Sequence, residues 1–177
     1  MNLKISLGEK KGRKLHVSKN VEPVKNVVKL AVFSMLDDKI VDAKCLDLYA
    51  GSGNLGLEAL SLGAKECTFV DNNQDCINCI RLNSEKLNFE TKAEIIESDV
   101  EDFLSSPLST KYDIAFVDPP YKLTIDNIAQ KLLNCISASG VVVYLHHKNT
   151  KGYFDGFKVI RERVYGKTGV SLLEKSI

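Results

Sequence analysis

Two short motifs in the chain hold residues that could bind a ligand and carry out chemistry on it. The first, Leu46-Asp-Leu-Tyr-Ala-Gly-Ser-Gly-Asn-Leu-Gly56, spaces Gly51, Gly53 and Gly56 as G-x-G-x-x-G. It follows a strand-like apolar run and opens a helix-like run, a context in which glycines permit a tight turn and close backbone approach to a ligand. The second motif, Asp118-Pro-Pro-Tyr121, follows another strand-like run.

The glycine loop suits two ligand classes, and nearby acidic residues help to choose between them. A dinucleotide would place its pyrophosphate at the helix N-terminus, whereas S-adenosylmethionine would place its amino-acid end near the loop. Asp47 favours S-adenosylmethionine, because a carboxylate repels a pyrophosphate and attracts an ammonium group. Asp71 ends the next strand-like run and could accept hydrogen bonds from the ribose hydroxyls of either ligand. An alternative is that Asp47 only stabilises its own loop.

Asp99 follows the third strand-like run and has two possible roles. Its carboxylate could accept a hydrogen bond from an adenine amino group, or it could cap the helix that follows. The sequence leaves both roles open.

The chemistry of the second motif follows from its two prolines, its acid and its ring. Pro119 and Pro120 fix two φ angles and remove two backbone donors, so the segment is stiff and has free carbonyl groups. Asp118 and a proline carbonyl could accept hydrogen bonds from an exocyclic amino group and turn its lone pair toward a sulfonium methyl group. Tyr121 could stack on the nucleobase, a contact worth about 1–3 kcal/mol. The alternative is a strand-ending turn with a half-buried tyrosine.

An alternation of strand-like and helix-like runs must position both motifs. The expected strands are Cys45–Tyr49, Glu66–Val70, Ala93–Glu97, Tyr112–Val117 and Gly140–His146. The expected helices are Gly56–Leu62, Asp75–Leu87, Val100–Ser105 and Ile125–Ile136. Helices between consecutive apolar strands imply parallel pairing, so the pattern predicts a doubly wound α/β sheet with both motifs at one edge.

The ends of the chain depart from this alternation. Phe157–Val164 and Val170–Glu174 flank a glycine-containing turn, so the sheet is predicted to finish with an antiparallel hairpin. Residues 1–20 are predicted to form one or two short strands, and Pro23 is predicted to open a helix that ends at Leu36.

Composition places the chain among ordinary globular proteins. Its 177 residues, 44 % apolar and 27 % charged, predict one domain over 1–177, with an extension at 1–36 and a core at 44–177. No run approaches the ~18 apolar residues of a membrane helix, and the first residues lack the apolar core of a signal peptide. We therefore expect a cytoplasmic protein without a membrane partner.

The five cysteines are expected to be reduced thiols. Cys76-Ile-Asn-Cys79 lies in a helix-like run without further Cys or His partners at metal-ligand spacing, so we expect buried helix cysteines and no metal site. His146 and His147 are expected to end a strand.

Charge is distributed unevenly along the chain. Residues 1–30 hold eight basic and two acidic residues, whereas the whole chain has a net charge of only +1. A basic N-terminal arm on a mildly acidic body suits a polyanionic partner, although a solvated tail would have the same composition.

Taken in order, the motifs resemble the class I S-adenosylmethionine-dependent methyltransferases that act on exocyclic amines, and most closely the bacterial 16S rRNA guanine-N2 methyltransferases. The matching segments are Gly12–Leu15, Cys45–Ser61, Phe116–Tyr121 and Tyr165–Thr168. Glu22-Pro23-Val24 departs from the family, which usually carries Arg-Pro-Thr at this place.

The resemblance implies a seven-stranded, mostly parallel Rossmann-like sheet and S-adenosyl-L-methionine as methyl donor. We also expect a monomer. It implies as target a guanine of 16S rRNA, free or within a small-subunit assembly intermediate. The cofactor contacts that it implies are Asp47, Ala50, Gly51, Ser52, Gly53, Asp71 and Asp99. The catalytic segment that it implies is Asp118, Pro119, Pro120 and Tyr121.

Three other functions stay open at this point. The chain could methylate amino groups of DNA or of another RNA, since such enzymes can share the D-P-P-Y motif. It could be a catalytically silent rRNA-binding assembly factor. An NAD-dependent dehydrogenase would explain the glycine loop but would leave Asp118-Pro-Pro-Tyr121 unexplained.

Overall fold

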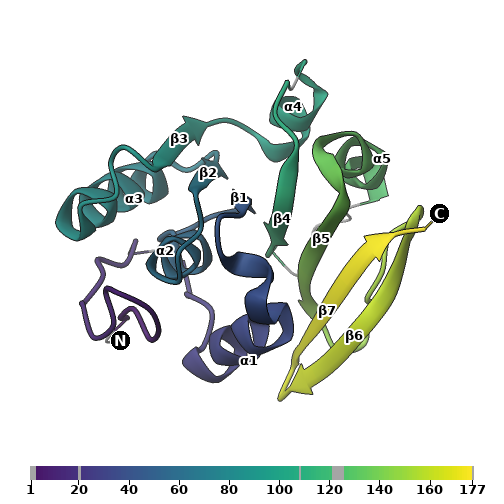
Figure 1. Ribbon diagram of the computed structural model, residues 1–177, viewed down its shortest axis with the longest axis horizontal. Helices are drawn as coiled ribbons and strands as arrows, with labels where there is room; N and C mark the ends of the chain where they lie inside the picture. The colour runs from purple at the N-terminus through teal and green to yellow at the C-terminus, as the bar shows by residue number, and fades with distance from the viewer. Residues whose placement is uncertain (1–2, 20, 108, 121–125, 177) are drawn as a thin grey trace.

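A seven-stranded mixed sheet forms the centre of the protein. The computed structural model describes residues 3–19, 21–107, 109–120 and 126–176. The strands are β1 (Lys44–Leu48), β2 (Glu66–Asp71), β3 (Ala93–Glu97), β4 (Tyr112–Val117), β5 (Ile136–His147), β6 (Phe157–Tyr165) and β7 (Thr168–Lys175). Their order across the sheet is β3-β2-β1-β4-β5-β7-β6 (Figure 1).

Strands β1 to β5 pair in parallel, and β7 pairs antiparallel with both β5 and β6. The predicted doubly wound sheet and its closing antiparallel hairpin are therefore confirmed. Parallel pairing brings the C-terminal ends of β1, β2 and β4 to the same edge of the sheet, where both motifs begin. We refer to this edge as the catalytic edge and to the other as the opposite edge.

Helices cover both faces of the sheet (Figure 1). They are α1 (Asn26–Leu36), α2 (Asn54–Ser61), α3 (Gln74–Leu87), α4 (Val100–Ser105) and α5 (Asp126–Cys135), with a 3-10 turn η1 (Asp37–Ile40). Alternate strand residues divide between two apolar cores. Cys45 and Phe69 pack with residues of α1, α2 and α3, whereas Leu46 and Val70 pack with residues of α4 and α5.

Helix boundaries follow from local capping chemistry. Asn73 caps α3 by accepting the backbone N–H of Asp75 at 2.9 Å, and Asn88 ends it in the left-handed conformation at φ 57°. Helix α1 begins at Asn26 and not at Pro23 as predicted, because Lys25 is still extended with ψ 144°. The predicted helix end at Leu36 is confirmed.

The N-terminal residues form a hairpin that lies against α2. Lys4 and Lys14 form an antiparallel bridge, and Ile5 donates to the carbonyl of Arg13 at 2.9 Å. Instead of the one or two short strands predicted for residues 1–20, the described residues of this segment form a hairpin with a single bridge. Gly8, at φ 73°, lies so close to the helix that an added Cβ would fall 1.9 Å from the carbonyl oxygen of Ser61. The hairpin is therefore a docked element and not a solvated tail.

Several smaller expectations also have outcomes. Strand β5 begins at Ile136, four residues before its predicted start at Gly140. All five cysteines are buried, and Cys76 and Cys79 lie on α3 as expected. His146 is buried near the end of β5, where its Nε2 lies 3.0 Å from the hydroxyl of Ser171. Across the described ranges, no helix has the length and apolar character needed to span a membrane.

Candidate active site

The glycine loop joins the end of β1 to the start of α2 through three residues with positive φ. These are Tyr49 at 59°, Gly51 at 57° and Gly53 at 76°. Gly53 precedes the first residue of α2, and its carbonyl accepts the N–H of Leu57 at 2.9 Å. The left-handed conformations turn the chain from strand to helix in five residues, and glycine adopts them with little strain.

Gly56 has a packing role and not a conformational one. A Cβ at this position would lie 2.3 Å from the ring of Phe69 on β2. Only glycine therefore lets α2 approach the sheet this closely. The third glycine of the motif thus has the role of close helix–strand contact, and the first two shape the loop.

Asp47 is buried beneath the glycine loop. Its carboxylate accepts the backbone N–H of Gly56 at 2.9 Å. Burial raises the pKa of Asp47 well above its usual value; the Gly56 hydrogen bond lowers it, and the charges of Asp118 and Asp71 raise it further. Asp47 therefore holds the start of α2 onto β1, as the structural alternative predicted, and it also contributes to an acidic centre.

Asp71 ends β2 and is half-buried beside the loop. One carboxylate oxygen accepts the N–H of Gly51 at 2.8 Å, and the other accepts the N–H of Asn73 at 2.9 Å. Each oxygen keeps a further lone pair for a ligand. The carboxylate thus fixes the distance between the glycine loop and the end of β2, where ribose hydroxyls were predicted to bind.

Ala50 and Ser52 are buried within the loop, and the N-terminal segment contacts Ser52. The N–H of Ala50 donates to the carbonyl of Val70 at 3.1 Å. The hydroxyl of Ser52 accepts the N–H of Ser18 at 3.2 Å. The residues just after the hairpin thus form one wall beside the loop.

Asp99 lies at the N-cap of α4, where its carboxylate accepts the N–H of Glu101 at 2.7 Å. The capping role that the sequence left open is therefore present. The residue is exposed, and its second carboxylate oxygen is available to a ligand. An adenine contact by Asp99 stays a prediction.

Asp118 follows β4, directly beside the end of β1, since Val117 and Leu48 are register partners. It is half-buried, and burial raises the pKa of its carboxyl to about 7. Among the described residues, none donates a hydrogen bond to this carboxylate. Pro119 is buried and Pro120 is exposed. Tyr121 lies outside the described residues, so its stacking role stays a prediction.

The structure thus brings three carboxylates, Asp47, Asp71 and Asp118, to the ends of neighbouring strands around the glycine loop. The interaction of Asp47 with the other two shows that they share one electrostatic environment. Such a centre disfavours a pyrophosphate and suits a ligand that carries ammonium and sulfonium charges. The residues present therefore fit S-adenosylmethionine better than a dinucleotide.

A buried polar network beside the loop was not found by sequence reasoning. The ammonium of Lys29 on α1 lies 2.6 Å from the carboxylate of Glu58 on α2, with 1 % and 0 % of the side chains exposed. Lys29 also donates to the carbonyl of Lys4 and to Asn54, the first residue of α2. Glu58 accepts the backbone N–H groups of Ser6 and Leu7.

This network corrects the assignment of Lys29 to the basic arm. Its charge is neutralised inside the protein, where it joins the hairpin, α1 and α2, so it is not available to a polyanion. Glu58 lies in the Gly56-Leu-Glu-Ala segment, and an acid within a buried helix could have signalled such a pair. A sequence alone does not show which lysine is its partner.

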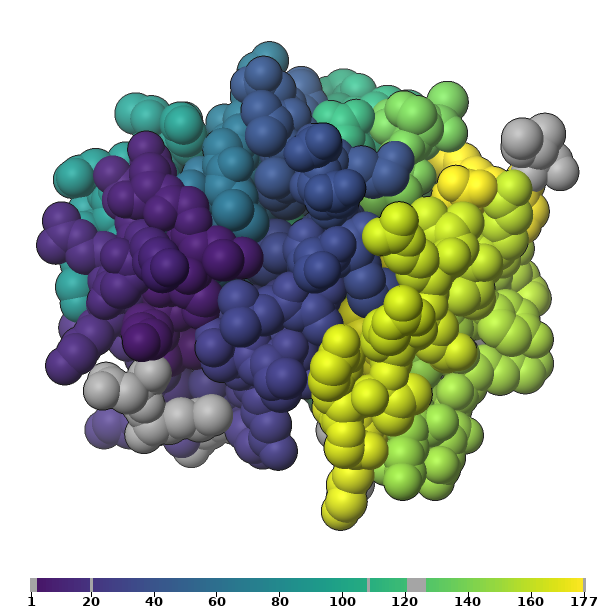
Figure 2. All heavy atoms as spheres, turned by 60° about the horizontal axis from the view of Figure 1, so that its bottom comes forward, coloured from purple at the N-terminus to yellow at the C-terminus, as the bar shows by residue number. Residues whose placement is uncertain are grey.

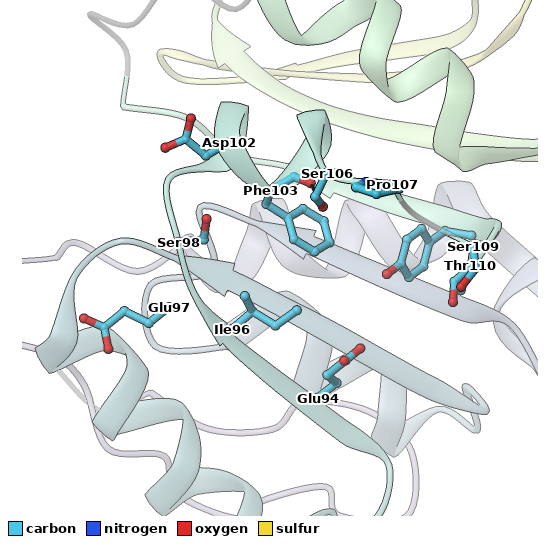
Figure 3. A pocket seen from close by; sticks show the side chains of 11 residues that line it. Glu94, Ile96, Glu97, Ser98, Asp102, Phe103, Ser106, Pro107, Ser109 and Thr110 are labelled. Atoms are coloured by element: carbon cyan, nitrogen blue, oxygen red, sulfur yellow. Dashed lines mark hydrogen bonds between the residues drawn. The ribbon is translucent and has the colours of Figure 1, made fainter.

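A cavity of about 520 Å³ lies between β3 and α4, next to Asp99 (Figure 3). Its lining includes Ser98, Asp102, Phe103 and Tyr112 but no residue of the glycine loop and not Asp118. Ser98 and Asp102 lie at the end of the cavity that is nearest to the catalytic edge. The cavity is therefore a neighbour of the acidic centre and not part of it.

Comparisons with known proteins agree with this geometry. Residues 3–174 match the model of the family described as Conserved hypothetical protein 95. The Escherichia coli protein named Ribosomal RNA small subunit methyltransferase D is 30 % identical over 98 % of this chain and 90 % of its own length. A Haemophilus influenzae protein of the same name is 36 % identical over 74 % of this chain and 70 % of its own length.

A solved structure shows the same fold. The structure of Escherichia coli yhhF superposes with a TM-score of 0.88 at 28 % identity, and the match covers 99 % of this chain and 98 % of that chain. The chain belongs to the Conserved hypothetical protein 95 family. Its relatives include rRNA methyltransferases, and its Rossmann-like methyltransferase fold is confirmed.

Proposed function

We propose that this protein transfers a methyl group from S-adenosyl-L-methionine to the exocyclic N2 amino group of a guanine in small-subunit rRNA. Relatives that are named small-subunit rRNA methyltransferases support the reaction class and the kind of substrate. The observation that supports the function most directly is the acidic centre. Asp118, with a carboxylate that no described residue bonds, stands one strand away from the glycine loop.

The loop side of the site binds the methyl donor. Asp47 attracts the ammonium group of its amino-acid end, and the backbone of Ala50 to Gly53 lies against that end. Asp71 accepts hydrogen bonds from the ribose hydroxyls, and Asp99 contacts the adenine amino group. Because the acidic set repels a pyrophosphate, we expect NAD to be the poorer ligand.

The β4 side of the site holds the guanine. When bound, S-adenosylmethionine supplies a methyl group that is attached to a positively charged sulfur. After transfer of the methyl group, the sulfur is left as a neutral thioether. Asp118 and the carbonyl of Pro119 accept hydrogen bonds from the amino group and orient its lone pair. Once the nitrogen carries the methyl group and a positive charge, Asp118 or water takes the proton.

A carboxylate with a pKa of about 7 can exchange a proton near neutral pH, which suits this role. Orientation of the two reactants supplies much of the acceleration, and well-aligned groups can contribute about 7–11 kcal/mol. Tyr121 is proposed to stack on the base, which must be unpaired or flipped out to reach the site.

The same proposal extends to the setting of the reaction. The chain acts as one catalytic domain, as a monomer in the cytoplasm, on 16S rRNA or on a small-subunit assembly intermediate. A catalytically silent rRNA-binding protein is the second candidate, and the altered segment Glu22-Pro23-Val24 favours it. In this segment the carbonyl of Val24 accepts the amide of Asn54 at 3.1 Å, and Val21, the residue before the segment, lies beside Gly51.

Calorimetric titration of the purified protein tests the cofactor assignment. We expect saturable binding of S-adenosylmethionine and of its demethylated product, and no comparable binding of NAD. Binding of NAD alone would contradict the assignment. Binding of the donor without methyl transfer to small-subunit rRNA would favour the silent RNA-binding protein.

A further inference from the structure

The basic residues of the N-terminal hairpin do not all lie near the site. The tip of the hairpin docks on the last residue of α2, because the N–H of Glu9 donates to the carbonyl of Ser61 at 2.8 Å and that of Lys10 to its hydroxyl at 3.0 Å. Helix α2 starts at the glycine loop and ends at the opposite edge. Lys10 and Lys11 therefore lie far from Asp118.

A second group of cations lies at the catalytic edge. It consists of Lys148, Lys151, Arg163 and Lys167, which come from the end of β5, the loop after it, β6 and the β6–β7 turn. All four side chains are exposed, and none forms an ion pair with another described residue. The N–H of Lys148 donates to the carbonyl of Lys167 at 2.9 Å, which holds the loop beside the turn. We call this group the strand-end basic surface.

Neighbouring cations of β6 are engaged elsewhere and do not belong to this surface. Lys158, at the other end of β6, lies 2.9 Å from the carboxylate of Glu174. Arg161 donates to the carbonyl of Met35 on α1 at 3.3 Å. Lys158 is thus paired with an acid and Arg161 is held against α1, so neither is as available to a polyanion as the four cations of the strand-end basic surface.

Strand register places this surface on the same edge of the sheet as Asp118. Val117, the residue before it, is the register partner of Tyr144 on β5, and β5 continues three residues further to His147. With a rise of about 3.3 Å per residue, the end of β5 stands roughly 10 Å beyond the level of Val117. Strand β7 is two strands away from β4, about 10 Å at ordinary strand spacing.

An exposed ring lies within the surface. Tyr153 is 46 % exposed, and the ammonium of Lys151 lies 5.6 Å from the centre of its ring. A basic surface with an exposed aromatic side chain suits nucleic acid, in which phosphates and base faces alternate. An acidic protein fits this surface less well, because it has no nucleobase faces to stack on the ring.

We infer that the strand-end basic surface binds phosphates of the substrate RNA next to the methylated guanine. This inference rests on the proposed function and adds a second RNA-binding surface outside the active site. Figure 2 shows the N-terminal hairpin and the β6–β7 strands on opposite flanks of α1. RNA bound at the β6–β7 flank reaches Asp118 without crossing the hairpin tip.

The test compares two triple variants of equal charge change in the full chain. The first is Lys148→Gln with Lys151→Gln and Lys167→Gln. The matched control is Lys39→Gln with Lys65→Gln and Lys92→Gln, three exposed lysines at the opposite edge. Each protein is titrated with small-subunit rRNA at several salt concentrations, and S-adenosylmethionine binding and the melting temperature are measured in parallel.

We expect the strand-end variant to lose about tenfold to a hundredfold in RNA affinity at about 0.1 M salt. The slope of log affinity against log salt concentration should become less negative by about two to three, as expected when phosphate contacts are lost. The control should change less than about twofold, and both variants should bind the cofactor and melt as the natural protein does. Equal losses in the two variants, or no loss in either, would overturn the inference.

The inference and the proposed function can fail separately. If the natural protein binds rRNA through this surface but transfers no methyl group, the surface stands and the enzyme assignment falls. If it methylates rRNA and the strand-end variant matches the control in affinity and rate, the surface assignment falls and the enzyme assignment stands.

Discussion

The two sides of the acidic centre differ in how their carboxylates are used. On the loop side, Asp47 and Asp71 already accept backbone N–H groups of Gly56, Gly51 and Asn73. On the β4 side, no described residue donates a hydrogen bond to Asp118, and burial raises its pKa to about 7. The loop side is therefore held together by hydrogen bonds within the protein, whereas on the β4 side the proposed function assigns the Asp118 carboxylate to the substrate.

This contrast means that substitutions on the two sides should have different consequences. A change at Asp47 should affect the fold, because its carboxylate accepts the N–H of Gly56, and under the proposed function it should also weaken cofactor binding. A change at Asp118 should affect the chemical step, because little of the fold depends on it.

Asp118→Ala should lower the single-turnover rate of rRNA methylation by about a hundredfold to ten-thousandfold, the range for loss of a positioned proton acceptor. Cofactor affinity, measured by calorimetry, should stay within about twofold. The matched control is Asp102→Ala, an exposed carboxylate on α4 that should change neither quantity. A near-normal rate in the Asp118 variant would remove this residue from the mechanism.

Asp47→Ala should weaken S-adenosylmethionine binding by about tenfold to 150-fold, since a charge-assisted contact contributes about 1.5–3 kcal/mol. It should also lower the melting temperature, because the N–H of Gly56 loses its partner. Asp47→Asn separates the two effects: the amide oxygen can still accept from Gly56, but the charge is gone. If the Asn variant binds the cofactor as tightly as the natural protein, Asp47 has only a structural role.

The smallest effect that we expect concerns stability, and the Asp118→Asn variant measures it. The folded carboxyl has a pKa of about 7, whereas an unfolded aspartate has one of about 3.9. Between these two pKa values the folded state binds more protons than the unfolded state. The stability of the folded state therefore falls as the pH rises from about 4 to 7. The Asn variant lacks this loss, so it should melt at a higher temperature than the natural protein at pH 8 and at a similar temperature at pH 4.

The stability prediction is checked by thermal unfolding at several pH values between 4 and 8. A difference in melting temperature that is the same at every pH would mean that Asp118 does not titrate in this range. The Asp102→Asn protein serves as control, because its parent side chain is exposed.

Much of the core fold could be predicted because its signals are local. The bounds of β3, β4 and α4 agree residue for residue with the expected Ala93–Glu97, Tyr112–Val117 and Val100–Ser105. Short apolar runs between capping and turn residues carry that information. The start of β5 was placed four residues late, because Ile136 and its polar neighbours do not look like a strand until β4 pairs with them.

The candidate site could be predicted where glycines and strand ends define it, and not where distant residues meet. The motif predicts a tight turn, and Gly51 and Gly53 form it with positive φ angles. The Lys29–Glu58 pair and the strand-end basic surface depend on residues that are 29 or up to 19 positions apart in the chain. A run of consecutive basic residues can be recognised in a sequence, whereas a cluster of residues that only the fold brings together cannot.

The central claim is methylation of a guanine amino group in small-subunit rRNA, and one measurement tests it most directly. Small-subunit RNA from cells that lack this protein is incubated with the purified enzyme and labelled S-adenosylmethionine, then digested and analysed by nucleoside mass spectrometry. We predict label in N2-methylguanosine, at a single guanine, with none formed by the Asp118→Ala protein. Absence of transfer, or label in another nucleoside such as a methylated adenosine, would contradict the account.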